Sequence, residues 1–198
     1  MKSVDFIKEK FKEYYLQREI EAPPLVQERE FGVGVEKKID YRHLQFKDQS
    51  SLNAYLRSTV PLYISYSAAY YEFPAARPMS EKVWKGADLV FDLDVQDCDV
   101  RCTHPAELVC ERCMGEVKRE CIKLVDDFLK PDFGFSDDEI KVVFSGNRGF
   151  HVHIRSERVK ALSQEARKEI VEYLTGEGLQ VVRKINGVIY GPTPRTWG

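Results

Sequence analysis

The chain has 198 residues, of which 43% are hydrophobic and 31% charged, and its formal net charge at pH 7 is −2. This composition is typical of a globular domain with one sizeable core and excludes a disordered chain, while no apolar run approaches the roughly 20 residues that cross a bilayer. The charge excludes a globally basic nucleic-acid binder, so any contact with nucleic acid must be local or shared with a partner.

The first part of the chain predicts a helix, three strands and a second helix. Apolar side chains recur at helical spacing over residues 4–16, and two prolines at 23 and 24 follow. The next elements are expected as strands at 28–35, 39–46 and 61–66 and as a helix at 49–57. An aromatic cluster after the last of these strands is open to two interpretations, a base-stacking platform or core packing. Its members are Tyr63, Tyr66, Tyr70, Tyr71 and Phe73.

The second part predicts further strands and helices without regular alternation. The expected elements are a strand at 87–95, a helix at 116–129, a turn at 131–136, two strands within 140–154 and a helix at 163–174 ended by Gly176. Such an order predicts an α+β fold, with a mixed sheet and flanking helices. We expect one domain over residues 1–198, with a small cysteine-rich excursion at 96–121.

Two acidic residues, Asp92 and Asp94, end the apolar strand predicted at 87–95. Side chains two apart on a strand share a face, and two ionised carboxylates there repel each other unless a cation lies between them. Carboxylate oxygens suit Mg²⁺ or Mn²⁺. The alternative is that Asp94 begins a surface turn and Asp92 caps it.

A glycine-containing turn follows the next apolar strand, with Ser145, Gly146, Asn147, Arg148 and then His151. Glycine lets the backbone turn tightly and approach a ligand closely. Hydroxyl, guanidinium, imidazole and backbone amide groups together suit a polyphosphate, although the spacing is not that of the Walker-type loop. The alternative is a hairpin turn with a solvated polar face.

Four residues between these motifs have the spacing of a zinc site: Cys102, His104, Cys110 and Cys113. Three sulfurs and one imidazole form a complete tetrahedral ligand set, which predicts a structural rather than a catalytic zinc. Disulfides are the competing interpretation, which the absence of a secretory signal disfavours. Two further cysteines, Cys98 and Cys121, flank the cluster. They could be spare metal ligands; alternatively, Cys98 is a loop thiol and Cys121 packs on a helix face.

The order of these motifs resembles the small catalytic subunit of archaeal and eukaryotic DNA primases, and the archaeal branch more closely. The resemblance covers nearly the whole chain. Beyond the motifs above it includes Arg29-Glu30-Phe31, Arg42-His43, Tyr66-Ser67-Ala68-Ala69-Tyr70, residues 82–88 and the helix around residues 169–173.

This resemblance implies a primase catalytic domain that synthesises RNA primers on single-stranded DNA from nucleoside triphosphates during replication. It implies that Asp92 and Asp94 bind the catalytic Mg²⁺ or Mn²⁺, and that Ser145, Arg148 and His151, within the segment that includes Gly146 and Asn147, hold the triphosphate. It also implies the zinc ligands named above, and family positions near the active site for Arg29, Glu30 and Arg42.

The resemblance further implies a large primase subunit as partner and no membrane, with a cytoplasmic location if the protein is archaeal and a nuclear one if it is eukaryotic. One departure is that the family uses a third catalytic Asp, which we do not find after residue 154. We therefore expect a chain truncated before that motif, and poor primer synthesis by residues 1–198 alone. The alternatives are a primase-like polymerase of repair or plasmid origin and a non-catalytic, zinc-bearing scaffold that binds nucleotide.

Overall fold

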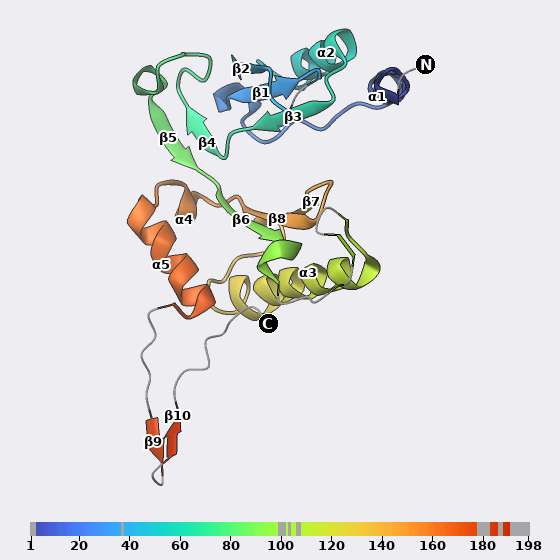
Figure 1. Ribbon diagram of the computed structural model, residues 1–198. Helices are drawn as coiled ribbons and strands as arrows, with labels where there is room; N and C mark the ends of the chain where they lie inside the picture. The colour runs from blue at the N-terminus through green and yellow to red at the C-terminus, as the bar shows by residue number, and fades with distance from the viewer. Residues whose placement is uncertain are drawn as a thin grey trace. The chain divides into compact units, whose positions relative to one another are not determined.

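The computed structural model describes residues 3–36, 38–98, 102, 104–105, 108–177, 183–185 and 188–190 (Figure 1). Its Cα trace divides into two compact units, residues 1–87 and 88–198, and each is described by itself. The single domain expected over 1–198 stays a prediction. Helices and antiparallel sheets occur in both units, so the α+β class is confirmed.

The first unit is built on a three-stranded antiparallel sheet with the order β2-β1-β3, and β4 pairs separately with β5. Its core gathers buried apolar residues from α1, the sheet and α2, among them Tyr15, Phe31 and Leu56. The elements are α1 (Ser3–Gln17), η1 (Val26–Glu28), β1 (Phe31–Gly34), β2 (Tyr41–Leu44), α2 (Gln49–Thr59), β3 (Tyr63–Tyr66), β4 (Ala69–Tyr71), η2 (Met79–Glu81) and β5 (Trp84–Ala87).

Both helices and all three strands predicted in this unit are present, although each strand is shorter than expected. Helix α2 begins with a capping box in which the side chains of Asp48 and Ser51 exchange hydrogen bonds with each other's backbone. Strands β4 and β5 were not predicted, because runs of three and four residues carry too little periodicity to detect. In the aromatic cluster, Tyr70 and Tyr71 are buried, which confirms core packing for these two, whereas Tyr63 and Phe73 are exposed.

The second unit is built on the antiparallel sheet β6-β8-β7. Helix α3 lies across one face of this sheet (Figure 1), where Val117 and Cys121 pack with Leu93 and Val152 in a common core. The elements are β6 (Leu89–Asp94), η3 (Val95–Asp97), α3 (Glu111–Lys123), η4 (Leu124–Leu129, a π-helical turn), β7 (Ile140–Phe144), β8 (Gly149–Ile154), α4 (Glu157–Lys160), α5 (Gln164–Thr175), β9 (Arg183–Ile185) and β10 (Val188–Tyr190).

The strand predicted at 87–95 is present as β6 at Leu89–Asp94, whereas Ala87 ends β5 and Asp88 interrupts the strand between them. The carbonyl of Asp88 accepts a hydrogen bond from Arg167 Nη1 at 2.9 Å, and the side chain of Asp88 is buried. The backbone carbonyl of Asp88 is thus bound by a residue of α5, and the pairing of β6 with β8 begins at Leu89. Arg155 Nε lies 3.9 Å from Asp88 Oδ2. This positive charge offsets part of the cost of burying the Asp88 carboxylate.

The helix predicted at 116–129 begins earlier than expected, at Glu111, so Cys113 belongs to its first turn and not to a loop. Cys110 occupies the N-cap position. The helix start was not predicted, because the spacing of Cys110 and Cys113 was interpreted only as that of metal ligands. The predicted turn at 131–136 and helix at 163–174 are confirmed, with Gly176 in the left-handed C-cap conformation. Helix α4 and the antiparallel strand pair β9–β10 were not predicted, and the loop expected at 193–198 lies outside the described residues. Among the helices described, none has the length and apolar character needed to cross a bilayer.

Strand β6 is pressed against the start of β8 at Gly149. A Cβ at this position would lie 1.9 Å from the carbonyl oxygen of Leu93 and 3.1 Å from Asp94 Cα. Neither contact can be relieved by rotating a side chain, because both partners are backbone atoms. The absence of a side chain at Gly149 therefore sets how closely β6 and the turn before β8 approach each other.

We expect Gly149→Ala to lower the free energy of unfolding by at least about 1–3 kcal/mol, the usual cost of overpacking. The matched control is Gly115→Ala in α3, where an added Cβ meets no atom within 4 Å. That change should raise the free energy of unfolding by roughly 0.5–1 kcal/mol, because alanine loses less conformational entropy in a helix. Urea denaturation measures both, and equal stabilities for the two variants would contradict the close approach.

Candidate active site and metal centre

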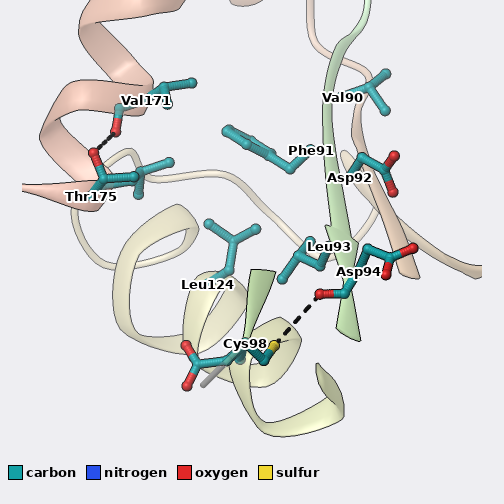
Figure 2. A pocket seen from close by; sticks show the side chains of 11 residues that line it. Val90, Phe91, Asp92, Leu93, Asp94, Cys98, Leu124, Val171 and Thr175 are labelled. Carbon is teal, nitrogen blue, oxygen red and sulfur yellow. Dashed lines mark hydrogen bonds between the residues drawn. The ribbon is translucent and has the colours of Figure 1, made fainter. Parts of the chain in front are cut away.

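The two carboxylates on β6 lie on one face of the strand, as predicted. Figure 2 shows the side chains of Asp92 and Asp94 on the side of β6 opposite Phe91 and Leu93. Leu93 is buried in the core, whereas the side chains of Asp92 and Asp94 are 76% and 31% exposed. The core side of the strand thus fixes the backbone, and the other side presents two carboxylates that a ligand can reach.

Strand β8 and the turn before it bring an imidazole and a guanidinium group to these carboxylates. In the register of the sheet, Asp92 is opposite His151 and Asp94 is opposite Gly149. His151 Nε2 lies 3.5 Å from Asp92 Oδ1, and Arg148 Nη2 lies 3.6 Å from Asp94 Oδ2. The structure therefore brings together Asp92, Asp94, Arg148 and His151. Both separations are longer than a normal hydrogen bond, so the two contacts are loose.

The turn between β7 and β8 is held by Ser145. Its amide donates to the carbonyl of Gly149 at 2.9 Å, and its hydroxyl oxygen accepts from the amides of Gly149 and Asn147 at 3.1 and 3.4 Å. Gly146 has a φ of +82°, a conformation that residues with a Cβ rarely adopt. The Ser145 hydroxyl keeps its own proton for donation, so ordering the turn and contacting a phosphate are compatible roles.

Gln96 is a participant that the sequence did not reveal. With its amide oxygen turned towards Arg148, it accepts from both terminal guanidinium nitrogens, at 2.7 and 2.8 Å. Gln96 lies in η3, whose first turn is capped by Asp94 through a 3.0 Å hydrogen bond from the Gln96 amide to Oδ1. Nothing in the sequence marks an isolated glutamine for this role, because it depends on how η3 folds back towards β8.

The capping contact also bears on the alternative interpretation of the two carboxylates. Asp94 does begin a short turn, as that interpretation states, but it uses only Oδ1 to cap it, and Oδ2 faces Arg148. The cap at η3 is formed by Asp94, and the side chain of Asp92 faces His151 instead. Both carboxylates thus keep an oxygen on the exposed face. Such a pair of hard oxygen donors fits a divalent ion such as Mg²⁺ or Mn²⁺.

The predicted zinc ligands form one cluster. The ligand atoms of Cys102, His104, Cys110 and Cys113 all lie within 4.8 Å of one another. The three sulfur–sulfur distances are 3.2, 3.5 and 3.7 Å, and His104 Nε2 lies 3.1 Å from the sulfur of Cys113. Tetrahedral zinc with bonds of about 2.3 Å to sulfur would place the sulfurs about 3.8 Å apart. These residues therefore can hold a metal such as zinc.

The sulfur distances also decide against disulfides in this cluster, since a disulfide bond is about 2.05 Å long. His104 Nδ1 lies 3.0 Å from the carbonyl of Pro105, and a proton on Nδ1 leaves Nε2 available as a ligand. The two flanking cysteines are not part of the cluster. Cys121 is buried in α3, as expected, and Cys98 lies near the end of β6 with its sulfur 3.7 Å from the Asp94 carbonyl.

The thiols of the cluster perturb one another. The pKa of Cys110 is lowered to about 6, first by hydrogen bonding with the Cys113 backbone and then by hydrogen bonding with the Cys113 thiol. The pKa of Cys102 is raised to about 11, mainly because its thiol donates to Cys113. The pKa of His104 is raised to about 9 by the Pro105 carbonyl and the neighbouring sulfurs. Without a metal, the four side chains are thus connected by shared protons in hydrogen bonds. A bound cation would displace these protons.

The three remaining candidates lie in the first unit. Arg29 is fully buried and donates to the carbonyls of Pro24 and Ser67 and to the Tyr70 hydroxyl, and its guanidinium carbon lies 4.2 Å from the centroid of the Tyr70 ring. These contacts give Arg29 a packing role within this unit. A role for it near the active site stays a prediction.

Glu30 connects a lysine and a histidine of the first unit. Its carboxylate lies 3.2 Å from the buried ammonium group of Lys82 and 3.1 Å from His43 Nδ1, and it accepts from the His43 amide at 3.2 Å. Glu30 and the exposed Arg42 both line a cavity of about 250 Å³ beside β1 and β3. The structure thus brings these two candidates to one cavity within the first unit.

For the cluster we expect elemental analysis to find one tightly bound zinc ion per chain. Cys110→Ser should abolish retention of the metal and lower thermal stability, because structural metal binding is coupled to folding. Cys121→Ser, whose sulfur packs in the core, is the control and should retain the metal. Protein purified without zinc, with all of these thiols freely reactive, would contradict the prediction.

Comparison with known proteins agrees with these motifs. A family model described as DNA primase small subunit matches residues 91–188, which include both carboxylates, the cysteine cluster and the glycine turn. Proteins named DNA primase small subunit PriS are similar over most of the chain. That of Methanothrix thermoacetophila is 42% identical over 189 residues, 94% of this chain and 47% of its own length. That of Thermoplasma volcanium is 37% identical over 182 residues, 89% of this chain and 54% of its own length.

A third relative, from Methanocella arvoryzae, is 42% identical over 183 residues, which is 88% of this chain and 44% of the relative. The chain thus spans about half the length of the curated relatives that it matches. The resemblance of this chain to the small-subunit family of DNA primases, in its archaeal form, is thereby confirmed.

Proposed function

We propose that this chain is the nucleotide-holding part of a DNA primase, which joins ribonucleotides into a primer on single-stranded DNA. The observation that carries the proposal is the face of the β6-β8-β7 sheet, where Asp92 and Asp94 lie beside His151 and Arg148 at 3.5 and 3.6 Å. Carboxylates suited to divalent ions next to donors suited to phosphate are what nucleotidyl transfer requires. The names of the relatives, DNA primase small subunit PriS, support the same activity.

Each residue has a separate role in this proposal. Arg148 binds the triphosphate through its planar fork, and Gln96 keeps that fork oriented by accepting from its terminal nitrogens. His151 donates to a phosphate oxygen from the neighbouring strand position. Mg²⁺ or Mn²⁺ held by Asp92 and Asp94 would neutralise phosphate charge and activate the primer's 3′-hydroxyl. The rigid sheet keeps these groups at fixed separations, which lowers the entropic cost of bringing the reactants together.

The second element of the proposal is a structural Zn²⁺ held by Cys102, His104, Cys110 and Cys113. Four protein ligands would fill a tetrahedral shell and leave no position for a reacting water. Cys110 and Cys113 lie at the N-cap and in the first turn of α3, and α3 packs on β6 and β8. Through this helix the metal would stabilise the strands that carry the carboxylates.

We also propose the partners and setting of the whole protein. The word "small" in the relatives' names supports a large primase subunit as the partner, and the sheet face supports nucleoside triphosphates and a single-stranded DNA template as ligands. Archaeal relatives support a cytoplasmic location. We further propose that a third carboxylate completes the metal site, in line with the family pattern, and primer synthesis is therefore to be tested with protein of the relatives' full length.

We expect Asp92→Asn and Asp94→Asn each to lower the rate of primer synthesis at least about a hundredfold, because both changes keep the shape of the side chain and remove its charge. The control is Asp137→Asn, whose side chain is 88% exposed and pairs with Lys130 away from the sheet face. It should leave the rate unchanged. The assay follows incorporation of labelled nucleotide on single-stranded DNA with Mg²⁺ or Mn²⁺, and circular dichroism verifies folding.

Full activity in either carboxylate variant would refute this assignment of the metal ligands. Triphosphate binding by the unaltered full-length protein without primer synthesis would instead favour the non-catalytic nucleotide-binding scaffold. Efficient synthesis from deoxyribonucleotides alone would favour the repair or plasmid polymerase.

A further inference from the structure

A cavity lies beside β6, and its lining includes Asp92 and Asp94 as well as Phe91 and Leu93. It has a volume of about 300 Å³ and is bounded by β6, α3, η4 and α5 within the second unit. Figure 2 shows Leu93 pointing towards Leu124 and the ring of Phe91 extending towards α5, where Val171 and Thr175 form the far wall. A size of this order and a largely apolar wall are usual for sites that bind small molecules.

One charged side chain lines this cavity away from β6, that of Glu120 in α3. The Glu120 side chain is only 9% exposed, and its Oε2 is buried without a hydrogen bond from any residue that the structure describes. Glu120 Oε2 forms an ion pair with Lys123 Nζ at 3.6 Å, beyond hydrogen-bonding distance. A carboxylate so placed loses hydration without full compensation, which is costly unless a further donor supplies it.

We propose that this cavity is a binding site for a small amphiphilic amine, whose apolar body lies between Phe91, Leu93 and Leu124 and whose ammonium group pairs with Glu120. The chemistry of the wall selects the class of ligand. Neutral apolar molecules would fill the volume but leave Glu120 uncompensated, and anions would be repelled by it. An ammonium group attached to a ring or a short chain satisfies both parts of the site.

Asp92 and Asp94 border this cavity too, but their side chains point to the other side of β6, where the proposed triphosphate site lies. Phe91 and Leu93 alternate along the strand with Asp92 and Asp94, so the same backbone carries both walls. Cys98 also lines the cavity and is half-buried. Its thiol offers a reporter for occupancy, since a ligand in the cavity would shield it from alkylation.

The test uses purified full-length protein and two probes of matched shape, 2-phenylethylamine and 2-phenylethanol. We expect saturable binding of the amine by calorimetry, at least about tenfold weaker binding of the alcohol, and loss of this preference in Glu120→Gln. Glu116→Gln is the matched control, because Glu116 is one turn earlier on α3, is paired with Arg119 and does not line the cavity. That variant should keep the preference for the amine.

A second measurement follows iodoacetamide modification of Cys98 by peptide mass spectrometry. The amine should slow alkylation of Cys98 in the unaltered protein, and this protection should be lost in Glu120→Gln. Absence of saturable amine binding, equal affinities for the amine and the alcohol, or unchanged amine affinity and protection in Glu120→Gln would each overturn the proposal.

Discussion

The close pairing of β6 with β8 is the constraint on which the candidate active site depends. Asp92 is aligned with His151 and Asp94 with Gly149, so these side chains take their positions from one antiparallel register, and Arg148 directly precedes the register at Gly149. A shift by one residue would turn both carboxylates into the core. Gly149 allows this close approach, because the carbonyl oxygen of Leu93 occupies the space that a Cβ at this position would need.

The register is in turn fixed by the opposite face of the sheet. Leu89 and Leu93 of β6 and Val152 and Ile154 of β8 are all buried, and they share a core with residues of α3, η4 and α5. Burial of a large aliphatic side chain is worth about 1.5–3 kcal/mol, whereas loose ion pairs at a surface contribute little. The apolar face therefore supplies the stability, and the polar face is left to hold like charges close together. Metal binding at the cysteine cluster would act on the same core through α3.

Much of this arrangement could be predicted from the sequence, because it depends on short-range periodicity. Alternation placed Asp92 and Asp94 on one face, and ligand spacing found the cysteine cluster, including the histidine that completes it. The start of α3 was mistaken, because Cys110 and Cys113 have the spacing of a loop motif and also fit a helix N-terminus. The break at Asp88 could not be predicted, since it depends on a hydrogen bond from Arg167, 79 residues later. Gln96 and Glu120 were missed for the same reason, because tertiary packing alone gives them their roles.

The central claim is that Arg148 and its neighbours on this sheet face bind the triphosphate, and calorimetric titration with a nucleoside triphosphate in the presence of Mg²⁺ tests it most directly. We expect Arg148→Ala to weaken binding about ten- to a hundredfold, since a charge-assisted hydrogen bond contributes roughly 1.5–3 kcal/mol. Arg148→Lys should recover little, because an ammonium group cannot replace the two-pronged donor. Arg119→Ala, a change to an arginine on α3 that is 71% exposed, should leave the affinity unchanged. Undiminished triphosphate affinity in Arg148→Ala would contradict the account.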